Sequence, residues 1–540
     1  MPTLEWIGKR AVVNHHREIP FRLLKCDPEL SVGDPESGNL LIEGDNLHAL
    51  KALLPYYAGK VKCIYIDPPY NTGNEGWVYN DNVNSPEIRK WLGEVVGREA
   101  EDLSRHDKWL CMMYPRLALL WEFLTQDGAL FVSVDDCEVQ HLRSILDEIF
   151  GKKNFVATVI WQKVYSPKNS ARHFSEDHDY LVVYAKDAER WAPNLLPRSE
   201  EQDRRYRNLD GDARGPWKTS DLSARNPYSR GTYPITCPSG RVVDGPPRGM
   251  YWRVSREEFD RLDRDNRIWW GRNRDSIPQI KRFLSEVKQG VVPQTLWRYE
   301  EVGHTQEAKQ ELLAICDFDD SASVFVTPKP TRLIRRIINI AGGDTALILD
   351  SFAGTGTTGQ AVMQSNKTDN GVRRFILVEL DQAICRGVAR QRLKNVVDGY
   401  SSRRLGTGEG IQGLGGGFRY CRLGEALFDE AGRINERVTF PDLAAHVFFS
   451  ETGTPISRRD SGCTPLLGVH QGRAIYLLFN GILGDLRPVG GNVLTRDVLA
   501  ALPEHDGPRV IYGESSRLSR DRLAREGIVF KQVPYEIRVG

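Results

Sequence analysis

A run of β-branched and aromatic residues that begins at Ile64 ends in Asp67-Pro68-Pro69-Tyr70. This pattern predicts a buried strand that stops at a rigid loop, because the two prolines fix φ and remove two backbone donors. A carboxylate, a free carbonyl and an aromatic face would then stand together at the carboxyl end of a strand, where open α/β sheets bind ligands. The alternative interpretation is a proline-rich strand exit with a packed tyrosine.

A second, glycine-rich segment follows the apolar run 346–349 and reads Asp350-Ser351-Phe352-Ala353-Gly354-Thr355-Gly356-Thr357-Thr358. Its glycines permit close approach of the backbone to a ligand, and the helix predicted over 359–365 would offer free N–H groups. Glu379 ends the next predicted strand, 23 residues after Gly356, which is the usual place for a carboxylate that binds ribose hydroxyls. This order predicts a site for a ribose-bearing cofactor. The segment lacks a third glycine and a P-loop lysine, which disfavours a dinucleotide or a nucleoside triphosphate.

The elements that position these loops are predicted from apolar periodicity. Residues 39–45 indicate a short strand that ends in Gly-Asp, and Leu47, Leu50 and Leu54 share one face of a following helix. Asp45 is either the N-cap of that helix or a carboxylate that faces the polar edge of a ligand. Strand, acidic turn, helix and strand is the alternation of a parallel sheet.

The chain after Tyr70 is predicted to add a long loop and then more of the same sheet. A polar, Asn- and Gly-rich stretch extends to about residue 100, long enough to predict a functional or mobile loop. The elements predicted next are a helix at 109–123, a strand at 129–134, a helix at 139–150, and strands at 155–161 and 180–185. The last two strands are expected to form an antiparallel pair that ends an otherwise parallel sheet.

The segment from 201 to 300 differs from the rest of the chain in composition. It carries 20 Lys and Arg against 14 Asp and Glu, although the net charge of all 540 residues is only +1. It also holds five of the twelve tryptophans, which are Trp217, Trp252, Trp269, Trp270 and Trp297. Cations and aromatic rings in irregular sequence predict a surface that reads nucleic acid. The alternative is a small domain with a salt-bridged surface.

The nine cysteines are scattered and no C-x-x-C occurs. This distribution argues against a zinc ribbon or a disulfide framework and favours a reducing compartment. No metal site is predicted. The amino terminus lacks an apolar core of signal-peptide length, and no stretch of about 18 apolar residues exists. A soluble cytoplasmic protein with no membrane association is therefore expected.

With both loops in this order, the sequence resembles the β-class amino-methylating DNA methyltransferases that use S-adenosylmethionine. Within that class it is similar to the modification subunit of type III restriction systems. The resemblance covers about residues 36–400. It rests on the two loops, on Gly44-Asp45-Asn46-Leu47, on Thr327-Pro328-Lys329-Pro330 after a strand predicted at 324–326, and on the tail that begins Gly416-Gly417-Phe418-Arg419-Tyr420.

The resemblance implies a circularly permuted α/β fold of the S-adenosylmethionine-dependent methyltransferase (Rossmann-like) type. A mostly parallel sheet with an antiparallel edge hairpin would be joined by an inserted target-recognition domain and a small C-terminal α/β domain. The expected divisions are an irregular arm (1–35), a catalytic half (36–190), a target-recognition domain (191–320), a cofactor-binding half (321–403), a linker (404–417) and an assembly domain (418–540). The expected partners are double-stranded DNA, a second copy of the chain, and a separate restriction or defence subunit.

The resemblance also assigns roles to individual residues. The catalytic residues would be Asp67, Pro68, Pro69 and Tyr70. The residues that bind S-adenosylmethionine would be Asp45, Lys329, Asp350, Phe352, Ala353, Gly354, Thr355, Gly356, Thr357 and Glu379. The residues that contact DNA would be Trp161, Tyr165, Arg253, Arg272 and Arg274.

The residues of the first loop suggest how a nucleobase amine could react. If Asp67 and the Pro68 carbonyl each accept one N–H, the nitrogen lone pair leaves conjugation and can attack a sulfonium methyl. The base must be flipped out of the duplex to reach the loop, and Tyr70 would stack on it. Asp at the first position of the loop favours the N6 amine of adenine. Methylation of the N4 amine of cytosine and a non-catalytic, cofactor-sensing DNA-binding module are the alternatives.

Overall fold

The computed structural model describes residues 3–71, 104–316, 318, 327–401, 410–429, 433–456, 464–482 and 484–534. The chain divides into two compact units. The sheet unit comprises Met1–Asn194 and Gln294–Gly540, and the inserted unit comprises Leu195–Pro293. The expected loop to about residue 100, the strand at 324–326 and residues 404–409 of the expected linker lie outside the described residues. No helix in the described ranges is both long and apolar enough to cross a membrane.

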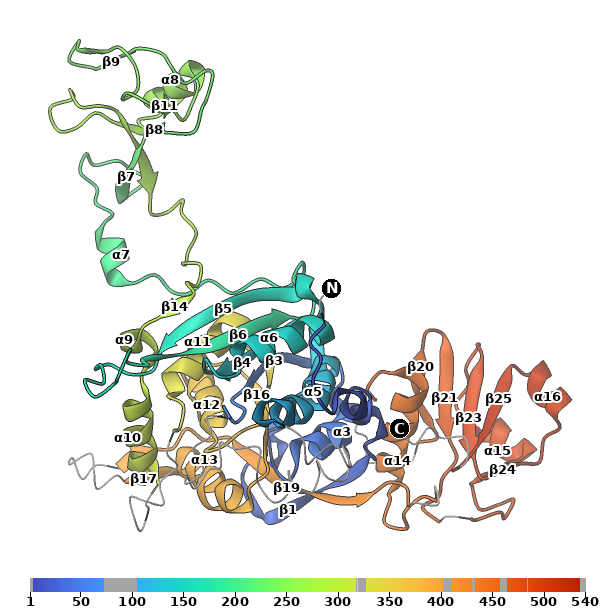
Figure 1. The fold of residues 1–540 in the computed structure, drawn as a ribbon. Coiled ribbons are helices and arrows are strands. Elements are labelled where there is room, and N and C mark those ends of the chain that lie inside the picture. The colour runs from blue at the N-terminus through green and yellow to red at the C-terminus, as the bar shows by residue number, and fades with distance from the viewer. Residues whose placement is uncertain are drawn as a thin grey trace. The chain divides into compact units, whose positions relative to one another are not determined.

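A ten-stranded sheet organises the sheet unit (Figure 1). Its strands, in spatial order, are β1 (Arg22–Gly33), β19 (Gly417–Ala426), β2 (Leu40–Glu43), β16 (Arg374–Glu379), β15 (Leu347–Asp350), β3 (Val61–Ile66), β4 (Leu124–Val134), β6 (His178–Ala185), β5 (Phe155–Gln162) and β14 (Leu296–Trp297). The pairs from β19 to β4 are parallel, and β6 and β5 follow as an antiparallel pair. The predicted α/β class, mostly parallel with an antiparallel hairpin, is confirmed.

Strands from the two ends of the sequence alternate in the centre of this sheet. β15 lies between β16 and β3, and its Ile348 and Leu349 pair in parallel with Cys63 and Ile64. The carboxyl ends of β3 and β15 therefore lie at the same edge of the sheet, side by side. This spatial order is the circular permutation that the order of the two loops predicts.

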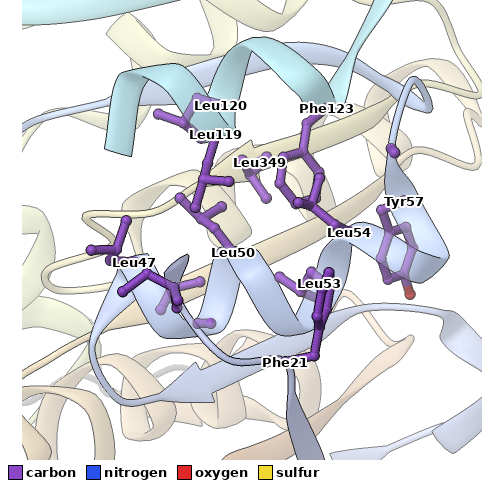
Figure 2. Close-up of a cluster of buried hydrophobic side chains, with 14 of the residues drawn as sticks. Phe21, Leu47, Leu50, Leu53, Leu54, Tyr57, Leu119, Leu120, Phe123 and Leu349 are labelled. Carbon is purple, nitrogen blue, oxygen red and sulfur yellow. The ribbon is translucent and has the colours of Figure 1, made fainter. Parts of the chain in front are cut away.

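One face of the sheet is covered by α3 (Asn46–Tyr57), α5 (Arg105–Phe123) and α6 (Val139–Leu146). Figure 2 shows Leu50 and Leu54 of α3 meeting Leu120 and Phe123 of α5 around Leu349 of β15. All of these side chains are buried. Burial of one such side chain contributes about 1.5–3 kcal/mol, so the apolar stripes of both helices hold them against the strands that end at the two loops.

The opposite face is covered by α11 (Thr331–Ala341), α12 (Thr357–Asp369) and α13 (Arg390–Asp398). α12 packs closely on β16, because a Cβ added to Gly359 would lie 3.0 Å from a Leu377 methyl and 2.8 Å from Leu393 of α13. Gly359 therefore serves helix packing, at the place where α12 leaves the glycine-rich loop.

The structure differs from the predicted domain boundaries at both ends of the sheet. Residues 1–35, expected as an irregular arm, contain α1 (Lys9–Val12), α2 (His15–Glu18) and β1. β19, expected in the linker and the assembly domain, lies inside the central sheet between β1 and β2. Phe418 and Tyr420 of β19 are buried, and Arg419 between them is partly exposed. This alternation explains why the strand belongs to the sheet. The glycine run before it obscures that alternation in the sequence.

β1 and β19 also carry a disulfide, which the scattered cysteines did not predict. Cys26 and Cys421 are register partners in this antiparallel pair and are bonded to each other. The other described cysteines form no disulfide.

The remaining elements of the sheet unit flank the sheet or follow β19. They are α9 (Tyr299–Val302), α10 (Thr305–Ile315), β17 (Gly399–Ser401), β18 (Gly410–Gln412), α14 (Phe440–Thr452), β20 (Leu466–His470), β21 (Arg473–Leu477), β22 (Val493–Leu494), α15 (Arg496–Ala501), β23 (Arg509–Gly513), β24 (Ser515–Ser516), α16 (Arg520–Arg525) and β25 (Ile528–Gln532). Strands β20, β21, β23 and β25 form a separate four-stranded sheet, which agrees with a small C-terminal α/β region.

The inserted unit has its own small core. Its elements are α7 (Glu200–Arg204), β7 (Trp217–Asp221), β8 (Ser223–Ala224), β9 (Ile235–Thr236), β10 (Val242–Val243), β11 (Tyr251–Trp252), α8 (Arg256–Arg264), β12 (Ile268–Trp269) and β13 (Gln279–Phe283). Trp217, Trp252 and Trp270 are buried, so these rings build the core and do not form a stacking surface. Tryptophan content therefore indicated a compact domain here and gave no evidence for base stacking.

Candidate functional site

A cavity of about 340 Å³ opens where β3 and β15 end, in the sheet unit. Most of the residues expected at the site line it, namely Asp67, Pro68, Pro69, Tyr70, Trp161, Lys329, Asp350, Phe352, Ala353, Gly354, Thr355 and Thr357. The two loops meet here because β3 and β15 are parallel neighbours in register. Two motifs that are almost 300 residues apart in the sequence therefore form one site.

Asp67 has two differently engaged oxygens. Its Oδ2 accepts a hydrogen bond from the Lys329 ammonium, while its Oδ1 is buried and has no hydrogen-bond partner among the described residues. The Lys329 nitrogen also lies 5.0 Å from the centre of the Tyr70 ring and 5.9 Å from that of Trp161. Lys329, expected to bind a cofactor, thus contacts the first loop directly. A buried acceptor without a partner costs about 1–3 kcal/mol, so Oδ1 favours a ligand that donates to it.

The Tyr70 ring lines the cavity, and its hydroxyl is buried next to Asp67. Burial, and then the Asp67 carboxylate, raise the pKa of this hydroxyl well above its usual range. The hydroxyl completes no hydrogen bond with the described residues. Tyr70 therefore remains a neutral aromatic surface at any physiological pH.

Trp109 and Asn71 hold the first loop from outside the cavity. The Trp109 indole of α5 donates to the Pro69 carbonyl at 2.7 Å. Asn71, with φ of 60°, donates from its side-chain amide to the Arg105 carbonyl at 3.1 Å and to Glu138. The Pro68 carbonyl receives no hydrogen bond from the residues that the structure describes and is available to a ligand. Sequence reasoning missed both supports, because a tryptophan in an amphipathic helix gives no signal of its partner.

Arg392 supports the glycine-rich loop. The sequence did not predict this role. This fully buried side chain donates from Nη1 to the hydroxyls of Thr355 at 2.9 Å and Thr357 at 2.8 Å, and from Nε to Gln360 at 2.6 Å. Burial lowers the pKa of its guanidinium. Asp350 fixes the start of the same loop by accepting from Phe352 N at 3.1 Å and from the Thr358 hydroxyl. Burial raises the pKa of Asp350 to about 7.

Two carboxylates expected to bind a cofactor are engaged by the protein itself. Glu379 accepts from Gly354 N at 2.7 Å and Asp381 N at 3.0 Å, and burial raises its pKa to about 7. Asp45 caps α3 by accepting from the backbone of Leu47 and His48. The Arg116 guanidinium also donates to Asp45 at 2.7 Å. The N-cap interpretation of Asp45 thus agrees with the structure.

Several expected residues do not line the cavity. Asp45, Gly356 and Glu379 lie behind the residues that do. Tyr165 is about half exposed and packs against the rings of Tyr299 and His304. Arg253, Arg272 and Arg274 belong to the inserted unit, and no ion pair engages them within the described ranges. Many neighbouring arginines in that unit, such as Arg267 with Glu286, are paired with acids.

The far wall of the cavity carries charges that the sequence did not single out. Asp179 is buried and accepts from Lys163 at 2.6 Å, and burial raises its pKa. Asp135, at the end of β4, has its pKa raised to about 6, chiefly by burial. The cavity is therefore lined by carboxylates, lysines and aromatic rings, a combination suited to a polar, aromatic ligand.

The sequence was compared with those of known proteins. A family described as DNA methylase matches residues 61–390. The type III restriction-modification enzyme StyLTI Mod subunit of Salmonella typhimurium strain LT2 is 36% identical over 418 residues, which cover 74% of this chain and 62% of that protein. The type III EcoPI Mod subunit of Escherichia phage P1 is 31% identical over 434 residues, which cover 71% of this chain and 64% of that protein.

A further relative is covered more fully. The type II methyltransferase M.KpnI of Klebsiella pneumoniae is 30% identical over 380 residues, which cover 66% of this chain and 83% of that protein. By contrast, the chain spans a little under two thirds of the length of the two Mod subunits.

Arg392→Met should destabilise the protein, because it leaves the Thr355 and Thr357 hydroxyls and the Gln360 amide without their buried donor. We expect the free energy of unfolding to fall by at least about 2 kcal/mol, measured by urea denaturation at neutral pH. The exposed Arg386→Met is the matched control and should change it by less than about 0.5 kcal/mol. Equal effects of the two variants would contradict the supporting role of Arg392.

Asp350→Asn should weaken the pH dependence of stability. With a pKa of about 7 in the folded state, Asp350 retains a proton that the unfolded chain releases between roughly pH 4 and 7. As the pH rises through that window, the free energy of unfolding of the wild type should therefore fall, and Asp350 should account for up to about 4 kcal/mol of the fall. The variant should lose less stability over the same pH range. Urea unfolding at pH 5 and pH 8 measures the difference. The exposed Asp344→Asn should keep the wild-type slope, and an unchanged slope in Asp350→Asn would count against this assignment.

Proposed function

We propose that this chain, which belongs to the DNA methylase family, transfers a methyl group from S-adenosylmethionine to the N6 amine of an adenine in DNA. The observation that carries the proposal is the single cavity in which the Asp67–Tyr70 loop faces the glycine-rich loop after β15. A base amine held at the first loop and a methyl donor held at the second would lie next to each other. Proximity of this kind supplies about 7–11 kcal/mol of a reaction barrier.

The glycine-rich side of the cavity fits the methyl donor by its chemistry. Phe352 offers an aromatic surface, and Asp350 and Asp67 place carboxylates on the cavity wall for a cationic group. Gly354 and Gly356 have positive φ values of 51° and 77°, which the tight turn before α12 requires. When bound, S-adenosylmethionine supplies an electrophilic methyl group on a sulfonium. Thr355, Thr357 and the backbone of Gly354 are the groups we assign to its binding, with Arg392 and Glu379 holding them in place.

The Asp67 loop is suited to activate an exocyclic amine. Asp67 Oδ1 has no hydrogen-bond partner among the described residues, and no backbone N–H among them donates to the Pro68 carbonyl. Each can accept one N–H, which pulls the nitrogen toward tetrahedral geometry and releases its lone pair for attack. The amine held in this way would accept the methyl group that bound S-adenosylmethionine would supply, and its surplus proton would pass to solvent. Lys329 donates to the other oxygen of Asp67, which leaves Oδ1 for the base.

Tyr70 and Trp161 are the aromatic surfaces available to a flipped base. The Lys329 nitrogen lies within 6 Å of the centres of both rings, so the rings lie on the same part of the cavity wall as Asp67. The Trp161 indole is oriented by a 3.0 Å bond to the Gly303 carbonyl. A purine stacked there would bring its amine to Asp67, at a flipping cost of a few kcal/mol.

Similarity to the StyLTI and EcoPI Mod subunits supports a modification subunit of a type III restriction-modification system. In such a system the restriction activity would reside in a separate chain. The inserted unit, with Arg272 and Arg274 free of ion pairs to described residues, would contact double-stranded DNA and select its sequence. The segment after β19 would mediate assembly with a second copy or with the restriction subunit, in the cytoplasm.

A methylation assay tests the function. The purified chain should transfer labelled methyl from S-adenosylmethionine to duplex DNA, and genomic DNA from an expressing host should carry N6-methyladenine in one sequence motif. N4-methylcytosine in that motif would replace the adenine assignment by the alternative. Cofactor-dependent DNA binding without any methyl transfer would indicate a non-catalytic module.

Asp67→Asn should remove methyl transfer and spare the fold. The substitution preserves size but halves the acceptor capacity of the side chain. We expect kcat at saturating DNA and S-adenosylmethionine to fall at least about 100-fold, comparable to the loss of one preorganised polar group at a reacting centre. Calorimetry should show unchanged S-adenosylmethionine affinity. A folded variant with near-normal kcat would disprove this mechanism.

Lys329→Met separates two roles for this lysine. If Lys329 positions Asp67, kcat at saturating substrates should fall at least about tenfold with S-adenosylmethionine affinity unchanged, because Asp67 loses the group that holds its Oδ2. If Lys329 instead binds the cofactor, its loss should weaken S-adenosylmethionine affinity, measured by calorimetry. The exposed Lys367→Met is the control and should behave as the wild type in both measurements.

A further inference from the structure

Glu138 lies at the centre of a buried cluster behind the first loop. Its side chain is fully buried, and its two oxygens contact two histidines, with Oε1 2.7 Å from His106 Nδ1 and Oε2 2.8 Å from His141 Nδ1. Asn71 donates a further hydrogen bond to Oε1 at 2.6 Å. The cluster lies outside the methyl-transfer cavity, since none of these residues lines it.

The local folding brings the three groups together. Glu138 and His141 are three residues apart at the start of α6, which places them on the same face of the helix. His106 comes from the first turn of α5, 32 residues before Glu138. The sequence predicted no metal site, on the basis of its scattered cysteines, and did not single out these three residues.

A buried carboxylate needs a positive charge close to it. No Lys or Arg in the described part of the chain forms an ion pair with Glu138, and its contacts are an amide and two imidazoles. The cluster therefore consists of nitrogen and oxygen groups with no Lys or Arg paired to the carboxylate, a setting that favours a bound cation. The two histidines are only partly buried, with 38% and 21% of their side chains exposed, so an ion can reach them from solvent.

We propose that His106, Glu138 and His141 form a binding site for a divalent transition-metal ion, with Zn²⁺ as its simplest occupant. One ligand atom from each residue lies within 4.8 Å of the other two. Two imidazoles and one carboxylate are a donor set that Zn²⁺ binds with a fourth position open. Mg²⁺ and Ca²⁺ are disfavoured, because they select oxygen ligands.

The two imidazoles contact different oxygens of Glu138, so a metal held by one ligand atom from each residue requires a local rearrangement of these side chains. Around a tetrahedral Zn²⁺ with ligands at about 2.0–2.1 Å, two ligand atoms lie about 3.3 Å apart. The nitrogen–oxygen separations of 2.7 and 2.8 Å would each open by about half an ångström as the metal replaces the Nδ1 protons. Metal binding would join the start of α5 and the start of α6 to Asn71, the residue that follows Tyr70. This proposal does not depend on the reaction at the cavity.

The test uses the full-length protein, stripped with a chelator and dialysed against Zn²⁺ or Co²⁺. Wild type should retain one Zn²⁺ per chain by atomic emission, and bound Co²⁺ should give a visible absorption band. Loss of a partner one shell away from a metal costs about 10–100-fold in affinity, so loss of a ligand in His106→Gln or His141→Gln should cost at least about 100-fold. The exposed His173→Gln is the control and should bind like the wild type.

Thermal unfolding gives a second readout. Zn²⁺ should raise the Tm of the wild type and of His173→Gln by mass action, and should leave both cluster variants unchanged. Both variants keep Glu138, so they should fold. Wild type that binds no more Zn²⁺ than the two cluster variants would overturn the proposal and leave a cluster held by hydrogen bonds alone. Equal loss of Zn²⁺ in His173→Gln would overturn it as well.

Discussion

The parallel register between β15 and β3 is the constraint on which the site depends. Ile348 opposite Cys63 and Leu349 opposite Ile64 place Asp350 and Asp67 at neighbouring strand ends. A slip of one residue would turn every side chain of β15 to the other face of the sheet. Leu349 would then leave the apolar cluster formed by α3 and α5 (Figure 2). Ordinary core packing thus fixes the relative position of two loops that the sequence separates widely.

Buried polar side chains complete the positioning that the core begins. Arg392 holds the hydroxyls of the glycine-rich loop, Lys329 holds one oxygen of Asp67, and Arg116 connects Asp45 to Asn46. Asn46 in turn donates to the Ser351 carbonyl at 2.8 Å. Each of these groups would be costly to bury alone, so each is paired with a group on a different segment. The loops at the cavity are therefore held in place before a ligand binds, by hydrogen bonds between groups of the protein itself.

The sequence predicted well the features that depend on local pattern. The strand before Asp67, the strand before Asp350 and the antiparallel pair β5–β6 all follow from apolar runs and turn residues, and the meeting of the two loops follows from their positions at strand ends. Features that depend on distant pairing could not be predicted. β1 and β19 join only in the folded sheet, and Trp109, Arg392 and Glu138 acquire their roles from residues far away in the sequence. Composition misled at the tryptophans of the inserted unit, because large aromatic side chains serve cores as readily as surfaces.

The position of β19 has a consequence for synthesis on the ribosome. β2, β3 and β4 are made within the first 134 residues, but their neighbours β15, β16 and β19 are complete only at residue 426. Before β15 is made, both edges of β2 and one edge of β3 lack their partners, and one edge of β2 lacks its partner β19 until residue 426. Such non-local pairing is slow, and unpaired strand edges favour aggregation. The nascent chain is thus expected to depend on chaperones until β19 is made, and the sheet to be completed only after residue 426.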